Sequence, residues 1–438
     1  MLVARNDVKK VFGQSLGLLK LLREKFLQFL SWSEKYTRMD MVYFVESGFW
    51  VTVGQVVASG TSFALALAFA NLLPQEIYGQ YKYVLGLAGL LGALTLTGLE
   101  TSVVQAVARG FEGALKTAFW ENLKWSAVFI AVAFSMSFYY YFFHGDQLLA
   151  ISFLIIAIFV PFISSANLYL PFLNGKKEFR TKVVYEAFSK IFFGIFIVSA
   201  ILFSGRIAVL IIAYFSAQFI TAIFFYWRAL KKYRPNREID PGLIRYAGHL
   251  SVLNILDIIA SNLDKVLVFN YLGAIPLAVY SFAIGVPEQT KPFLKGLTNI
   301  ILPRFSERTE SDIRANLANK ILKLFIFNLV IVMAYIALAP FFYRAFFPAY
   351  GESVLYSQIF SLSMLAGSIT PIEIFLLAKK KIKEQYVIRL SVSIFQIAAV
   401  AVLTVWMGLL GLILARVITR FFVTFINVFI YIRMPKEL

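Results

Sequence analysis

The sequence contains no cysteine and only two histidines, His144 and His249. These absences exclude disulfide bonds, thiol nucleophiles, iron–sulfur clusters and zinc sites built from cysteine and histidine. The chain also lacks a GxxxxGK[ST] phosphate loop and an HExxH motif. We therefore expect neither ATP hydrolysis nor another enzymatic activity, and no resident cofactor.

Charged residues are scarce as well. Among 438 residues only 15% are charged, whereas 60% are hydrophobic and 17% aromatic; a soluble domain carries about 25% charged residues. This composition indicates an all-α polytopic membrane protein. A spanning helix needs roughly 20 largely apolar residues. Twelve such segments are predicted, at 47–70, 80–104, 120–143, 148–173, 183–203, 207–229, 243–271, 276–302, 321–343, 353–377, 386–406 and 410–432.

The basic residues lie almost entirely on one side of these spans. On the side of the N-terminus the loops and termini hold 32 lysines and arginines, against two in the opposite loops. The positive-inside rule then places both termini in the cytoplasm and the chain in the cell (cytoplasmic or inner) membrane. Residues 1–40 alternate basic and apolar side chains at helical spacing, which predicts an amphipathic segment on the membrane surface. Topology accounts for most of the net charge of +18, so no nucleic-acid partner is expected.

The chain is predicted to be doubled. The most polar internal loop, 231–242, lies near its midpoint and reads as a cytoplasmic linker. The stretches 71–81 and 270–280 both run from Asn to Tyr over the same ten-residue spacing, at equivalent outer turns. The pattern predicts an N-terminal six-helix bundle over 41–230 and a C-terminal one over 243–438, arranged as parallel repeats around a central cavity.

Polar side chains interrupt two neighbouring predicted spans. The first carries His249, Asn254, Asp257, Ser261, Asp264 and Lys265, and the second Glu288, Lys291, Lys295 and Asn299. At about 100° per residue, His249, Asp257 and Asp264 gather within about 80° on the first helix, and all four residues do so on the second. Charge near the bilayer centre costs several kcal/mol. Two interpretations stay open: the residues line a wet cavity in which the lysines attract an anion and the carboxylates take H⁺ or Na⁺, or they pair as structural charges between packed helices.

Other polar positions are more ambiguous. Gln55 and Ser59 belong to a stripe at 3–4 spacing that either lines the cavity or packs helices. Glu100 is a candidate coupling carboxylate or a partner for a lysine. Arg416 and Arg420 share one face of their span, which favours a structural role by pairing or snorkelling.

Several stretches together resemble a known family. ANLLPQEIYGQYKYVLGLAGLLGALTLTGLETSVVQAVARG (70–110) is similar to the first two helices of the polysaccharide flippases, the O-antigen and lipid-linked-oligosaccharide branch of the multidrug/oligosaccharidyl-lipid/polysaccharide exporter superfamily. LDKVLVFNYLGAIPLAVYSFAIGV (263–286) resembles helices 7 and 8, ILPRFSE (301–307) the end of helix 8, and GLLGLILARVITRFF (408–422) the last helix. The resemblance covers most of residues 45–432.

The resemblance implies two six-helix bundles in a V, a cavity lined largely by helices 1, 2, 7 and 8, and a polyprenyl-pyrophosphate-linked oligosaccharide as cargo. Cavities of this family are typically cationic, a role that Lys291 and Lys295 would fill. The expected cavity residues are Lys291, Lys295, Glu288, Asn299, His249, Asn254, Gln55 and Ser59, and the coupling candidates are Asp257, Asp264, Glu288 and Glu100. Expected partners are the lipid-linked oligosaccharide and membrane lipids, with polysaccharide-assembly proteins as candidates.

Two further functions stay open at this point. An ion-coupled exporter of small amphipathic cations, as in the multidrug branch, calls for an acidic or aromatic cavity without paired lysines. An enzyme or assembly scaffold of the polysaccharide pathway calls for catalytic residues or a partner-binding domain, and the sequence shows neither.

Overall fold

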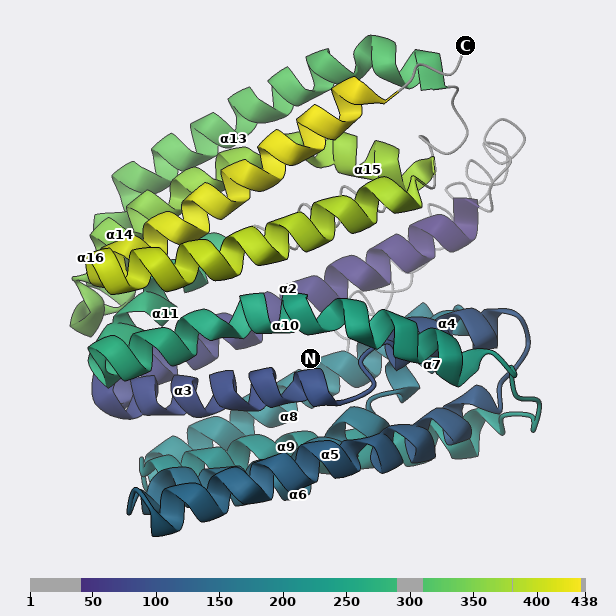
Figure 1. Ribbon diagram of the computed structural model, residues 1–438, viewed down its shortest axis with the longest axis horizontal. Helices are drawn as coiled ribbons and strands as arrows, with labels where there is room; N and C mark the ends of the chain where they lie inside the picture. The colour runs from purple at the N-terminus through teal and green to yellow at the C-terminus, as the bar shows by residue number, and fades with distance from the viewer. Residues whose placement is uncertain (1–40, 290–309, 380, 435–438) are drawn as a thin grey trace, which may run out of the picture.

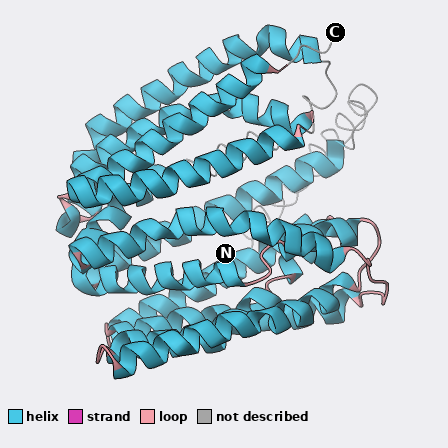
Figure 2. Ribbon diagram, in the orientation of Figure 1, coloured by secondary structure: helices cyan, strands magenta, loops and turns pink. Residues whose placement is uncertain are grey.

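The structure is a computed structural model and describes residues 41–289, 310–379 and 381–434. Within these residues the regular structure is entirely helical, with short connecting loops (Figure 2). The helices are α2 (Met41–Leu72), α3 (Gln75–Leu91), η1 (Gly92–Leu94), α4 (Leu99–Ala108), α5 (Ala114–Phe142), α6 (Gln147–Ala166), α7 (Tyr169–Gly175), α8 (Phe179–Phe203), α9 (Ile207–Tyr233), α10 (Leu243–Leu272), α11 (Ala274–Glu288), α13 (Glu310–Phe346), η2 (Pro348–Tyr350), α14 (Ser353–Ser361), η3 (Leu362–Ile369), α15 (Thr370–Ala378) and α16 (Ile382–Arg433).

The all-helical membrane class is confirmed over the described residues. Eight helices there are long and apolar enough to cross a bilayer, or nine if the bent pair α3–α4 forms one span. Large apolar side chains face outward, with Phe203 89% and Trp406 81% exposed, as expected for surfaces in contact with lipid. The chain is thus a multi-pass membrane protein, while the number of twelve spans, the two bundles and the domain bounds remain predictions.

Two breaks shape the long helices. The α3–η1–α4 run bends by 57° between η1 and α4. Gly408 interrupts α16 with φ of 59°, a left-handed conformation that favours glycine. The two arms of α16 fold back beside each other in Figure 1, and a Cβ at Gly411 would lie 1.9 Å from the Leu403 carbonyl oxygen. The 52 residues of α16 would extend about 78 Å if straight, more than twice the hydrocarbon thickness, so this fold-back matches the two separate predicted spans.

Most of the helices α2–α9 pack mainly on one another, and so do most of the helices α10–α16. The exceptions are α3 and α10, which pack more on the opposite group. They meet where α3, η1 and α4 contact α10 and α11, a surface that we call the seam (Figure 1). Glycines allow close approach at both of its ends: a Cβ at Gly79 would lie 1.9 Å from the Ala274 carbonyl oxygen, and one at Gly98 would lie 2.2 Å from that of Ala247. The seam therefore brings α10 and its polar side chains against the N-terminal helices.

Candidate functional site

The acidic side chains of α10 and α11 meet the arginines of α16. Asp264, only 1% exposed, forms an ion pair with Arg416. Tyr280 of α11 donates its hydroxyl hydrogen bond to Asp264 and accepts one from Arg416 Nε at 3.2 Å. This triad ties three helices together, and it satisfies a carboxylate that would be very costly to bury alone.

A second ion pair lies nearer the N-terminal end of α10, away from the predicted outer side of the membrane. Arg389 pairs with Asp257, which also accepts a hydrogen bond from Ser393. Arg389 Nη2 donates to Asn254 Oδ1 at 2.7 Å, and Asn254 Nδ2 donates to Thr97 Oγ1 at 3.0 Å. A continuous polar chain thus leads from α16 through α10 and across the seam to the N-terminal helices.

The third pair joins α11 to the second arm of α16. Arg420 forms an ion pair with Glu288 and donates to Ser363 Oγ at 2.8 Å. Its guanidinium also lies 4.7 Å from the ring centroid of Phe360, a cation–π contact. The three carboxylates expected to couple transport to ions, Asp257, Asp264 and Glu288, are each engaged by an arginine in this conformation.

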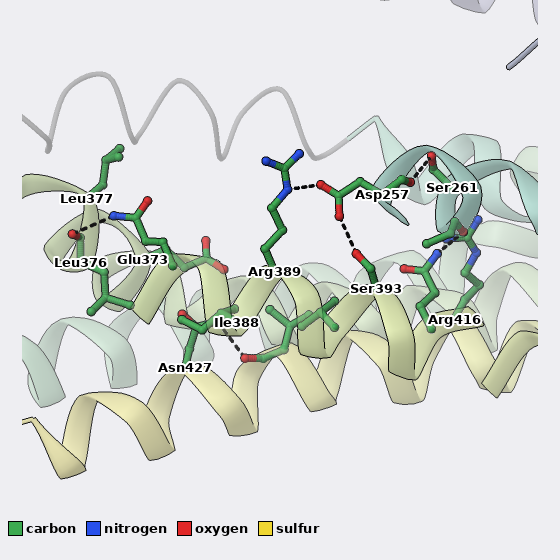
Figure 3. Close-up of a pocket in the computed structure, with 15 residues that line it drawn as sticks. Asp257, Ser261, Glu373, Leu376, Leu377, Ile388, Arg389, Ser393, Arg416 and Asn427 are labelled. Carbon is green, nitrogen blue, oxygen red and sulfur yellow. Dashed lines mark hydrogen bonds and ion pairs between the residues drawn. The ribbon is translucent and has the colours of Figure 1, made fainter. Parts of the chain in front are cut away.

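Two cavities adjoin the Arg389–Asp257 pair. One, of about 520 Å³, lies among α10, α15 and α16, and Figure 3 shows Glu373, Arg389, Ser393 and Asn427 around it. The other, of about 370 Å³, opens at the seam. It is lined by Thr97, Glu100, Asn254, Asp257, Ile258, Ser261 and Arg389.

Arg389 therefore borders both spaces, and its side chain stays 41% exposed despite the ion pair. A guanidinium in this position has donors left for an anion after it has bound Asp257. Glu100, across the seam cavity, is exposed and forms no ion pair with a described residue. The seam cavity thus combines one partly free cation with one free carboxylate.

The remaining predicted site residues are scattered. His249 is exposed on α10 and lines neither of these cavities. On α2, Gln55 donates to Ser59 Oγ at 3.1 Å, and both are half-buried away from the two cavities. Lys291, Lys295 and Asn299 lie outside the described residues, as does the segment 1–40.

The sequence predicts roles for Asn254, Asp257 and Glu100 separately, and the structure brings the three together at the seam cavity. The sequence predicts no role for Arg389 or Thr97. Arg389 was counted among the cytoplasmic loop charges, although it lies four residues before Ser393 on the same helical face. The four-residue spacing of Arg389 and Ser393 is the sequence feature that indicates a shared polar face. No local pattern marks Thr97, because its contact with Asn254 spans 157 positions.

With the geometry in place, comparison with known proteins decides the family. The sequence profile described as "polysaccharide biosynthesis protein" matches residues 44–307, well over half of the chain. The chain belongs to the polysaccharide biosynthesis protein family. This match confirms the resemblance noted in the sequence. A search of curated proteins finds no match.

Solved structures share the fold. The lipid II flippase MurJ in an inward closed conformation is 13% identical, with a TM-score of 0.66 over 89% of this chain and 88% of that one. An outward-facing multidrug resistance MATE transporter of the MOP superfamily is 14% identical, with a TM-score of 0.57 over 90% and 94%. A MOP superfamily transporter from Pyrococcus furiosus, 13% identical, gives 0.56 over 90% and 95%. These three solved proteins are a flippase and two transporters, and the likeness shows the fold of this chain.

Proposed function

We propose that this protein is a flippase that moves a polyprenyl-pyrophosphate-linked oligosaccharide from the cytoplasmic to the outer leaflet, for synthesis of a cell-surface polysaccharide or glycoconjugate. The observation that carries the proposal is the family match over 44–307, within a fold shared with the lipid II flippase MurJ. Both termini would lie in the cytoplasm, as the distribution of basic residues predicts.

Alternating access would carry the head group across while the polyprenyl chain stays in the bilayer. In the proposed cycle Arg389, in the seam cavity, together with Lys291 and Lys295, attracts the pyrophosphate from the cytoplasmic side. Arginine suits this task because its planar fork of donors binds phosphate oxygens. The exposed fraction of Arg389 supports a role in binding besides its role in pairing with Asp257.

Coupling to H⁺ or Na⁺ is proposed to fall on Glu100. Asp257, Asp264 and Glu288 already hold a guanidinium, and an arginine stays charged at all physiological pH values. Glu100 has no such partner among the described residues and faces the seam cavity. A carboxylate in this position can take up and release a cation as the cavity changes its access.

The test is translocation of a fluorescent polyprenyl-pyrophosphate oligosaccharide in proteoliposomes. The unchanged protein should translocate the lipid, Lys291→Ala/Lys295→Ala and Arg389→Met should each reduce the rate at least tenfold, and Glu100→Gln should abolish any stimulation by an imposed ion gradient. Lys124→Met, on the exposed face of α5, serves as control. Unchanged rates in both folded variants that remove basic residues would remove the cationic cavity from the account.

A further inference from the structure

Two lysines lie at the seam, and neither forms an ion pair with a carboxylate of the described residues. Lys82 is on α3 and is half-buried. Its ammonium lies 5.2 Å from the ring centroid of Tyr78, and it forms no ion pair with any residue in the described ranges. Lysine so placed inside an apolar helix is rare and costly, and it marks a functional position by default.

Lys265 approaches from the other side of the seam. Its stem packs on α3 so closely that a Cβ at Gly86 would lie 2.9 Å from Lys265 Cβ. Gly86 is one helical turn beyond Lys82 on the same face of α3. The ammonium of Lys265 donates to Asn262 Oδ1 at 2.9 Å, a neutral partner. Lys265 therefore packs against the face of α3 that carries Lys82.

The two lysines also share one depth. Lys82 is seven residues from the start of α3 at Gln75, and Lys265 is seven residues from the end of α10 at Leu272. At 1.5 Å per residue each lies about 10 Å below the predicted outer ends of the helices. The Arg389 cavity lies further inward along α10, where Asp257 is about 12 Å from Lys265 along the axis.

The local charge does not balance. Asp264 is adjacent to Lys265 in sequence, but it is held by Arg416 and Tyr280. Around this part of the seam the described residues therefore place Lys82, Lys265 and Arg416 against a single carboxylate, an excess of two positive charges. A diphosphate carries the complementary charge, and lysines bind phosphate as point charges from either side.

We propose that Lys82 and Lys265 form a second anion site, which receives the diphosphate of the lipid-linked substrate on the outer part of its path. The site rests on the proposed function for the identity of its ligand. No described carboxylate forms an ion pair with either ammonium group, so a diphosphate between them would stabilise a state in which α3 and α10 have moved apart. The substrate thus passes from the inner arginine site to a lysine site nearer the outer face.

Binding of inorganic pyrophosphate to the detergent-solubilised full chain tests the proposal directly. Pyrophosphate should raise the melting temperature of the unchanged protein. Lys82→Met/Lys265→Met should weaken the apparent affinity at least tenfold, while Lys82→Arg/Lys265→Arg should retain it. Lys124→Met, which removes an exposed lysine of the same charge, should behave like the unchanged protein. An equal pyrophosphate response in the folded methionine variant, or none in the unchanged protein, would overturn the proposal.

A second measurement tests the lysine site even if the methionine variant fails to fold. It also distinguishes failure of the lysine site from failure of the proposed flippase function. The chain has no cysteine, so Lys82→Cys introduces a unique thiol, and pyrophosphate should slow its modification by a methanethiosulfonate reagent at least fivefold. No protection would contradict the site. Translocation of the lipid-linked oligosaccharide is measured in parallel. Absence of a pyrophosphate response in the unchanged protein, together with normal translocation, would overturn the lysine site alone. A pyrophosphate response without translocation of the lipid would count against the proposed function alone.

Discussion

Three arginines of α16, Arg389, Arg416 and Arg420, each neutralise one acidic residue of α10 or α11, and the pairs differ in burial. The side chain of Asp264 is 1% exposed, whereas those of Asp257 and Glu288 are 32% and 29% exposed. Removing one partner of a buried pair leaves an uncompensated charge, whereas the same change at the surface has little effect. The most buried pair is therefore structural, and the more open ones have room for exchange with a ligand.

Arg416→Met should thus lower the free energy of unfolding by about 3–5 kcal/mol, because Asp264 would lose its buried counter-ion. Thermal unfolding in detergent measures the change. The matched control is Lys124→Met, which removes the basic partner of an exposed pair with Glu121 and should cost under about 1 kcal/mol. Equal melting temperatures of the two variants would contradict a structural role for the Asp264–Arg416 pair.

Lys82→Met should change stability in the opposite direction. This lysine has no carboxylate to leave behind, and methionine fills a similar volume without a charge to desolvate. We expect a gain of about 1 kcal/mol or more in the same unfolding measurement. A loss as large as that of Arg416→Met would show that Lys82 is held by a stabilising contact and would argue against a site kept for a ligand.

At the level of helices, the close contact of α3 with α10 and α11 depends on glycine. Gly79→Ala would place a methyl group against the backbone of Ala274, and we expect it to destabilise the protein by about 1–3 kcal/mol. Gly60→Ala, in α2, is the control, because its Cβ meets nothing within 4 Å and alanine favours a helix by about 1 kcal/mol. Comparable stability of both variants would mean that the seam is looser than described.

The helices themselves followed from the sequence, because apolar runs of spanning length are a local property. The bend between η1 and α4 and the pairing of helices did not. Asp257 and Arg389 are 132 positions apart, and nothing in either span specifies the other. One interpretation left open by the sequence has the charges of α10 and α11 pair between these two helices, whereas the structure pairs Asp264 and Glu288 with arginines of α16. Lys82 is a lone charge within an apolar helix, a feature that indicates a functional position, but no role was predicted for it from the sequence.

For the whole molecule, the contacts of the seam determine whether the N-terminal and C-terminal helices can move relative to each other. Thr97 and Asn254 lie within hydrogen-bond distance across it, at 3.0 Å. In a chain without native cysteine, Thr97→Cys/Asn254→Cys should form a disulfide on oxidation and reduce lipid translocation at least tenfold. Reductant should restore the rate, and each single cysteine variant is the control. Full translocation by the oxidised double variant would contradict movement at this part of the seam.

The central claim concerns the cargo, and one reconstitution tests it most directly. The same proteoliposomes are assayed for a fluorescent polyprenyl-pyrophosphate oligosaccharide and for a fluorescent amphipathic cation, since solved structures of both flippases and multidrug transporters share the fold. The account predicts rapid translocation of the lipid-linked oligosaccharide and no protein-dependent transport of the cation. Transport of the cation without movement of the lipid would contradict it and would make multidrug export the function.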